Sequence, residues 1–231
     1  MPSRLILIET STSLCSTALA EDGKIICSRR STEPRAHASL TAPFVKEMLD
    51  ECGWSAADAD AVCVGMGPGS YTGLRVGVST AKGLCFGTGR PLLAVDTLDI
   101  LAHQALDLGL VPEGCAGILP MVDARRMEVY TAPFSPAGER LGEISSVVLE
   151  PGSFADMFAA GPVVVIGDAA EKASGVLPEG SYIQQCPEAG HMLQPALREL
   201  AAGNFRDVAY FEPFYLKDFV AKKSVVHGLR D

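Results

Sequence analysis

The order of apolar segments in the first 108 residues is the feature that most constrains the fold. Three strand-like runs (RLILIET, LCSTALA and KIICSR) come first, and the EDG at 21–23 is a hairpin turn signal. Apolar residues at helical spacing then predict a helix from His37 to Cys52, which is followed by the buried-strand run AVCVGM. A second helix is expected at about 72–87, and the strand PLLAV and the helix DTLDILAHQAL come after it. An antiparallel meander followed by alternating helices and strands is typical of a ribonuclease-H-like domain.

The second half of the chain repeats this order in outline. GILPMVD, MEVYTAPF and GERLGEISSVVLE are strand-like, SFADMFA favours a short helix, PVVVIG is a buried strand, and a helix is expected from Met192 to Ala202. The similarity is architectural and is not a sequence repeat. We therefore predict an α/β, actin-like (ASKHA) fold of two ribonuclease-H-like domains. The first spans residues 1–108 and the second, reduced, spans 109–231, with its last helix free to pack back on the first domain.

Charge and composition narrow the possible functions. The net charge of −9 makes the chain a poor stand-alone binder of nucleic acid, because neutralised phosphates supply most of that affinity. If tRNA or another nucleic acid is involved, a second protein is expected to bring it. The seven scattered cysteines form no C-x-x-C and indicate reduced thiols. No apolar run is long enough to span a membrane and no signal-peptide pattern is present, so we expect a cytoplasmic protein.

The glycine-rich segment GMGPGSYTGLRVGVSTAKGL, residues 65–84, could be a phosphate loop or a packing device. Leu74 follows Gly73 where a P-loop needs lysine, and Thr72 stands where the third glycine of a dinucleotide fingerprint belongs. A strand–loop–helix unit still presents backbone N–H groups to an anion. The possible anion contacts are Gly69, Ser70, Thr72 and, from the second half of the chain, Arg125.

A stripe of small residues on the helix after this loop favours the packing interpretation. Gly73, Gly77 and Ala81 recur every four residues and therefore lie on one face. A glycine inside a helix costs about 1 kcal/mol relative to alanine, which suggests that close packing compensates for it. The stripe could pack within this chain or against a helix of a second subunit.

Acidic residues at two corresponding turns are candidate metal or nucleotide ligands. Glu9 ends the first strand, where actin-like ATPases place a metal-holding carboxylate, and Asp123 is its counterpart in the second half. The residues at 124–126 (ARR) are bulky where backbone would have to approach phosphate, which argues against ordinary ATP binding. His37 is followed four residues later by Thr41, so no histidine pair is present. We predict no catalytic residue and no metal site.

Several long motifs together resemble one family. They are LILIETSTSLCSTAL, GMGPGSYTGLRVGVSTAKGL, PLLAVDTLDILA, PMVDARRMEVYTAPF, VVVIGD and EPFYLKDFVAKK, in order over nearly the whole chain. The chain resembles the TsaB (YeaZ) family of bacterial tRNA threonylcarbamoyladenosine biosynthesis proteins. Glu9 departs from that family, which usually has aspartate at this position.

The resemblance implies a non-catalytic subunit that binds and activates a catalytic paralogue, TsaD. TsaD carries a His-x-x-x-His metal pair and transfers the threonylcarbamoyl group to the adenosine next to the anticodon. The ATPase TsaE is a further expected partner, and tRNA is expected to be bound only through the complex. The chain alone is expected to form a homodimer. No cofactor of its own is implied, with nucleotide or metal entering only in the complex.

By position, the helices at 37–52 and 72–87 are those expected to bind the partner. The expected partner-binding residues are His37, Leu40, Phe44, Met48, Gly73, Leu74, Gly77, Val78, Ala81 and Leu84. Two alternative functions remain, a metal-dependent peptidase-like enzyme and a stand-alone actin-like ATPase. The missing second histidine opposes the first, and the bulky turn at 123–126 opposes the second.

Overall fold

The computed structural model describes residues 3–216, so the 217–223 part of the last motif and the end of the predicted second domain lie outside it. The first domain is built on a five-stranded sheet of order β3-β2-β1-β4-β5. Its strands are β1 Arg4–Glu9, β2 Cys15–Glu21, β3 Lys24–Ser31, β4 Ala61–Gly67 and β5 Leu92–Asp96. The first three strands form an antiparallel meander, and β4 and β5 add in parallel to β1.

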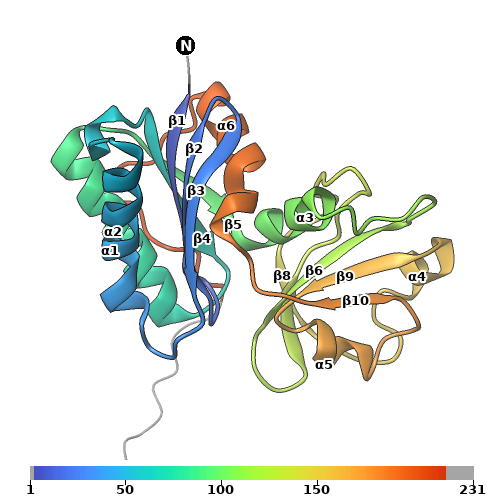
Figure 1. The fold of residues 1–231 in the computed structure, drawn as a ribbon. Helices are drawn as coiled ribbons and strands as arrows, with labels where there is room; N and C mark the ends of the chain where they lie inside the picture. The colour runs from blue at the N-terminus through green and yellow to red at the C-terminus, as the bar shows by residue number, and fades with distance from the viewer. Residues whose placement is uncertain (1–2, 217–231) are drawn as a thin grey trace, which may run out of the picture.

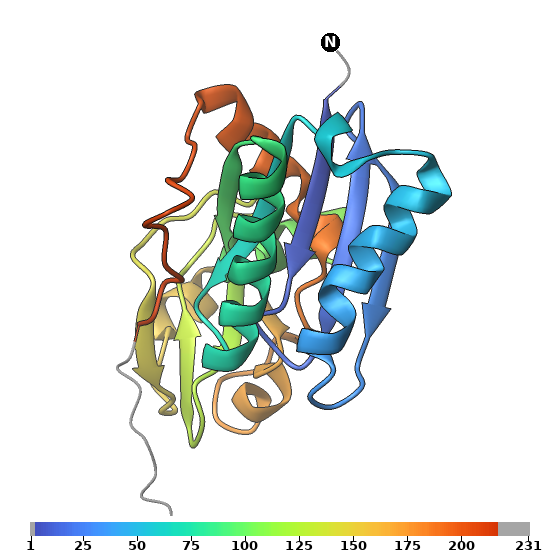
Figure 2. The ribbon, with the colours of Figure 1, turned by 90° about the vertical axis from the view of Figure 1, so that its left-hand side faces the viewer.

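Helices cover both faces of this sheet (Figures 1 and 2). On one face lie α1 His37–Cys52 and α2 Tyr71–Thr88, and on the other lie α3 Thr97–Asp107 and α6 Leu193–Ala202. Alternate residues of β1 pack on opposite faces of the sheet, because successive side chains of a strand point to opposite faces. Ile6 packs in the cluster under α1 and α2, and Leu5 packs in the cluster under α3 and α6. Burial on both faces explains why the strands are continuous apolar runs.

The second sheet repeats the topology of the first. Its order, read from the third strand, is β8-β7-β6-β9-β10, with β6-β7-β8 antiparallel and β9 and β10 parallel to β6. The strands are β6 Gly117–Asp123, β7 Glu128–Thr131, β8 Ser145–Val148, β9 Val163–Gly167 and β10 Ser181–Gln184. Its helices α4 Ala155–Ala160 and α5 Ala170–Ser174 have only six and five residues. The duplication confirms the actin-like fold with a reduced second copy.

The chain returns to the first domain after β10. Gln104 of α3 holds the returning segment, because its side chain donates to Cys186 O at 3.1 Å and accepts from Glu188 N at 3.1 Å. Two short 3-10 turns, Ala56–Asp58 (η1) and Ala189–Met192 (η2), precede β4 and α6 respectively. α6 then packs on the first sheet, and Arg206 N donates to Leu92 O at 2.8 Å.

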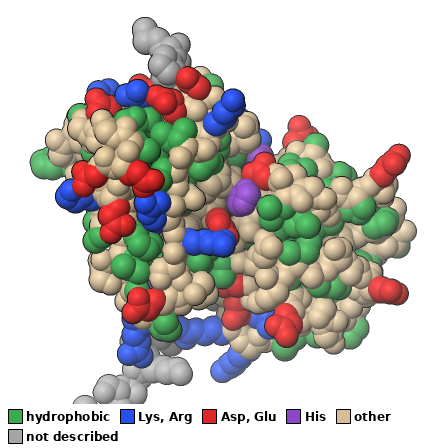
Figure 3. Space-filling model, in the orientation of Figure 1, with side chains coloured by type: hydrophobic (Ala, Val, Ile, Leu, Met, Phe, Trp, Pro, Cys, Tyr) green, Lys and Arg blue, Asp and Glu red, His purple; other side chains and the backbone are tan. Residues whose placement is uncertain are grey.

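The surface carries charges of both signs. Figure 3 shows acidic and basic side chains scattered over the face seen in Figure 1, with Lys and Arg gathered along the lower edge between the two domains. Among residues 3–216 there is no helix with the length and hydropathy needed to cross a membrane.

Candidate functional site

The glycine loop and α2 pack directly against the turn that follows β1. A Cβ added at Gly69 would lie 2.3 Å from Ser11 O, one at Gly73 2.1 Å from Thr10 O, and one at Gly77 2.2 Å from Thr10 Oγ1. Thr10 Oγ1 donates to Gly73 O at 2.8 Å. The glycines are therefore required because the loop and α2 approach the Thr10–Ser11 backbone and the Thr10 hydroxyl more closely than a side chain would allow.

This packing corrects the predicted partner surface. Six of the residues expected to bind a partner are buried in the core of the first domain: Met48, Gly73, Leu74, Gly77, Val78 and Ala81. The other four, His37, Leu40, Phe44 and Leu84, are half-buried. Helical periodicity of apolar residues identified the inward face of each helix, and that face is covered by this chain's own sheet. The stripe at Gly73, Gly77 and Ala81 therefore offers no surface to a second helix.

The amides at the start of α2 are largely used within the chain. Ser70 N donates to Ser11 O at 2.6 Å, and Gly73 N donates to the Ser70 side chain at 3.3 Å in an N-cap. Ser70 and Thr72 are exposed. The N–H groups of Ser70 and Gly73 thus already have acceptors, which weakens the predicted anion contact at Ser70.

Glu9 fills the turn between β1 and β2. Its side chain is fully buried, Oε1 accepts a hydrogen bond from Ser11 N, and Oε2 has no partner among the described residues. A Cβ at Gly65 would lie 1.9 Å from that oxygen, so the glutamate occupies the space left by the glycine. Burial raises the pKa of Glu9 to about 7. Within residues 3–216, no three His, Cys, Asp or Glu side chains are grouped to hold a metal ion.

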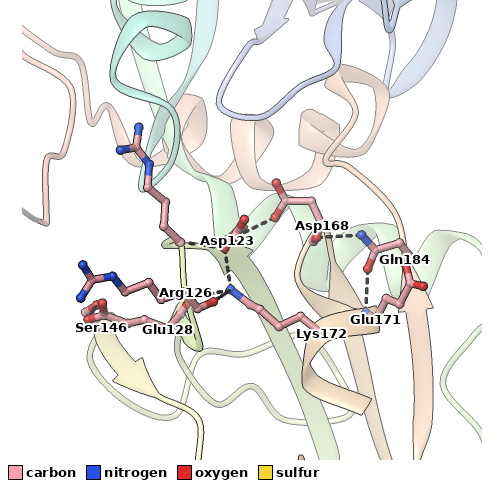
Figure 4. A network of polar contacts seen from close by, with 9 residues as sticks. Asp123, Arg126, Glu128, Ser146, Asp168, Glu171, Lys172 and Gln184 are labelled. Atoms are coloured by element: carbon pink, nitrogen blue, oxygen red, sulfur yellow. Dashed lines mark hydrogen bonds and ion pairs between the residues drawn. The ribbon is translucent and has the colours of Figure 1, made fainter. Parts of the chain in front are cut away.

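The corresponding turn of the second domain, between β6 and β7, is held by a polar network (Figure 4). Asp123 N donates to Asp168 Oδ1 at 2.8 Å, which ties the ends of β6 and β9 together. Lys172 of α5 donates to Asp123 Oδ1, to Arg126 O at 3.0 Å and to Glu128 O at 2.7 Å. Its ammonium group therefore bridges the two sides of the hairpin.

Asp168 is the most perturbed acid of this network. Burial, the largest cause, raises its pKa to about 6, although the hydrogen bond from Asp123 N opposes the rise. Gln184 of β10 donates to Asp168 O at 2.7 Å and accepts from Glu171 N at 2.7 Å. The sequence analysis singled out Asp123 alone, because Asp168 was seen only as the last residue of VVVIGD, and Lys172 and Gln184 belong to no motif.

The outer face of α1 and α2, toward the viewer in Figure 2, is open to solvent. Phe86 of α2 is 87% exposed. Ala42 of α1 is also exposed and lines a groove of about 270 Å³ together with Trp54 and Leu84. The sequence analysis did not single out Phe86, because Phe86 lies outside the apolar face of the helix that it followed. The available signal was an aromatic residue on the opposite, polar side of that helix.

Known proteins resemble this chain along nearly all of its length. The family model described as TsaD, tRNA N6-adenosine threonylcarbamoyltransferase, matches residues 30–172. The tRNA threonylcarbamoyladenosine biosynthesis protein TsaB of Escherichia coli K12 is 32% identical, covering 96% of this chain and 98% of that protein. TsaB of Bacillus subtilis is 33% identical over 55% of this chain and 53% of its own length. The structure of YeaZ from Pseudomonas aeruginosa superimposes with a TM-score of 0.80 at 30% identity, covering 93% of this chain and 100% of that one. This chain therefore belongs to the TsaB (YeaZ) family of tRNA threonylcarbamoyladenosine biosynthesis proteins.

Proposed function

We propose that the chain is a non-catalytic subunit that binds and activates the catalytic paralogue, TsaD, during threonylcarbamoyl transfer to tRNA. The observation that carries the proposal is the open outer face of α1 and α2, with Phe86 exposed at 87%. Aromatic side chains are enriched at protein–protein interfaces and are typical anchors there.

The shape of this face suits another helix pair. Ala38 and Ala42 of α1 and Gly83 of α2 are exposed and small, which leaves room for a partner helix to approach closely. Phe86 projects from α2 near Gly83 and residues 207–209. Burying one phenylalanine contributes about 1.5–3 kcal/mol. The buried stripe at Gly73 and Gly77 supports this face from behind and does not itself touch the partner.

The transfer chemistry is assigned to the paralogue. His37 contacts Thr12 O at 3.0 Å through Nε2, and Thr41, the residue four positions on, is buried and donates to His37 O at 2.7 Å. The His37 ring thus holds α1 to the β1–β2 turn, and the Thr41 hydroxyl is used within α1. The ATPase TsaE and tRNA join through the complex, and the chain alone forms a homodimer through the same outer face.

The first experiment is threonylcarbamoyl transfer to tRNA in a reconstituted mixture with and without this chain. Transfer is expected to collapse without it, and transfer that proceeds equally well would refute the proposal. Phe86→Asp should weaken binding to TsaD at least tenfold and convert the homodimer to a monomer in sedimentation. Leu141→Asp is the matched control, because Leu141 is 63% exposed in the second domain, away from this face.

A further inference from the structure

Two adjacent arginines occupy unfavourable backbone positions at the tip of the β6–β7 hairpin. Arg125 has φ of 68° and Arg126 has φ of 48°. Residues other than glycine, asparagine and aspartate rarely adopt this left-handed region, because Cβ crowds the backbone. A hairpin turn of this kind ordinarily selects glycine or asparagine. Large cations kept at such positions indicate a use for the side chains that outweighs the strain.

The carboxylates beside this turn are already engaged. Asp123 Oδ1 accepts from Arg125 N at 2.8 Å and from Lys172, and Glu128 Oε1 accepts from Ser146 Oγ at 2.6 Å. Among residues 3–216, neither arginine side chain has an ion pair or hydrogen bond. Both residues are exposed, and Figure 4 shows the Arg126 guanidinium directed away from Lys172. Within the described part of the chain, two positive charges on an acidic protein therefore have no counter-charge.

The other pair of adjacent arginines in the chain is different. Arg29 pairs with Glu51 and lies 3.9 Å from Glu47, and Arg30 pairs with Glu188 at 2.8 Å. Those guanidiniums are neutralised within the chain. The contrast shows that, among residues 3–216, the two pairs of adjacent arginines differ, and only the pair at the β6–β7 turn lacks carboxylate partners.

The turn is rigid enough to serve as a contact. Lys172 holds Arg126 O and Glu128 O, and Glu128 N donates to Arg125 O at 3.1 Å. The hairpin lies at the lower edge of the molecule, the end from which α2 begins (Figures 1 and 2), and Lys and Arg gather along that edge in Figure 3. Fixed backbone with free guanidiniums is well suited to phosphate, which guanidinium binds with paired hydrogen bonds.

We propose that Arg125 and Arg126 bind backbone phosphates of the tRNA substrate, so that this chain contributes a direct RNA contact to the complex. The inference rests on the proposed function, which supplies tRNA as the polyanion present during the reaction. A net charge of −9 keeps the contact weak for the isolated chain, and the catalytic paralogue provides the remainder of the binding surface.

The test is equilibrium binding of tRNA to the chain mixed with TsaD, and to the isolated chain at 50 mM salt. The variant R125G/R126G removes both cations and relaxes the backbone at the same time, so it should fold at least as well as the wild type. R125K/R126K retains the charge. K24A is the matched control, because Lys24 is an exposed cation without a charged partner in the described residues, at the β2–β3 turn.

Each phosphate contact contributes about 0.7–0.9 to the slope of log affinity against log salt. Loss of two contacts should therefore make the fall in tRNA affinity between 50 and 200 mM salt about tenfold smaller in R125G/R126G. R125K/R126K should retain most of the salt dependence, and K24A should match the wild type. Formation of the complex with TsaD, followed by sedimentation, should be unchanged in all three variants.

Equal tRNA affinity and equal salt slopes for R125G/R126G and the wild type would overturn the inference, as would absence of any tRNA binding in both preparations. Loss of ATP binding in R125G/R126G with tRNA binding intact would overturn it in favour of a nucleotide contact. Failure of the wild-type chain to associate with TsaD would refute the proposed function instead. In that case the isolated-chain comparison alone decides whether the arginines bind RNA.

Discussion

Replacement of Gly77 with alanine tests whether close approach to the β1 turn is the reason for the glycines of α2. The added methyl group would lie 2.2 Å from Thr10 Oγ1, well inside van der Waals contact. Thr10 is fully buried, and its hydroxyl is held by Gly73 O at 2.8 Å, so it cannot move aside without losing that hydrogen bond. Gly83 lies in the same helix with nothing within 4 Å of an added Cβ.

The comparison between these two positions isolates the packing term. Both substitutions gain about 1 kcal/mol of helix propensity, because both glycines are inside α2. Only Gly77→Ala adds a steric cost, about 1–3 kcal/mol for overpacking a well-packed core. Gly83→Ala should therefore be the more stable variant by about 1–3 kcal/mol, which corresponds to about 2–12 °C in Tm for a chain of this size.

The assay is thermal and urea unfolding of the two variants, followed by the same substitutions in a Thr10→Ala background. Thr10→Ala removes the clashing oxygen and leaves the next atoms at 3.5 Å, an ordinary contact. In that background Gly77→Ala should be as favourable as Gly83→Ala, because loss of the Thr10 hydrogen bond cancels in the cycle. Equal stability of Gly77→Ala and Gly83→Ala in the wild-type background would refute the reasoning.

Two further predictions concern the turns that end β1 and β6. The ordinary pKa of this carboxyl group is 4.5, and burial in the folded protein raises the pKa of Glu9 to about 7. Between these two pH values the proton on Glu9 is held mainly by the folded state, so the free energy of unfolding falls as the pH rises from 4.5 to 7. Relative to the wild type, Glu9→Gln should gain on the order of 3 kcal/mol of unfolding free energy between pH 4.5 and pH 8; a constant difference in urea unfolding across that range would contradict the assignment. Lys172→Met keeps the side-chain stem but loses the bonds to Arg126 O and Glu128 O, so a loss of about 1–3 kcal/mol is expected in urea unfolding at pH 7. An unchanged midpoint would show that the hairpin does not depend on the ammonium group.

The sequence by itself determined the architecture, because hydrophobic periodicity is a local property. The run at 5–8 has to be a strand buried on both faces, and the spacing from His37 to Cys52 has to be a helix, whatever surrounds them. The sequence missed β10 and α5, which are short and weakly patterned. It also missed the exposure of Phe86, since one exposed aromatic residue leaves no periodic signal.

The tertiary structure decided what each patterned face contacts. The small-residue stripe of α2 was visible in the sequence, yet only the fold shows that Thr10, more than 60 positions away, covers it. Likewise the two arginine pairs look alike in the sequence, but Arg29 and Arg30 are paired with carboxylates, whereas Arg125 and Arg126 have no carboxylate partner among residues 3–216. Periodicity reports which side of an element is apolar. The identity of the group that meets that side, or that neutralises a charge, depends on contacts between distant parts of the chain, and these exist only once the two sheets have formed.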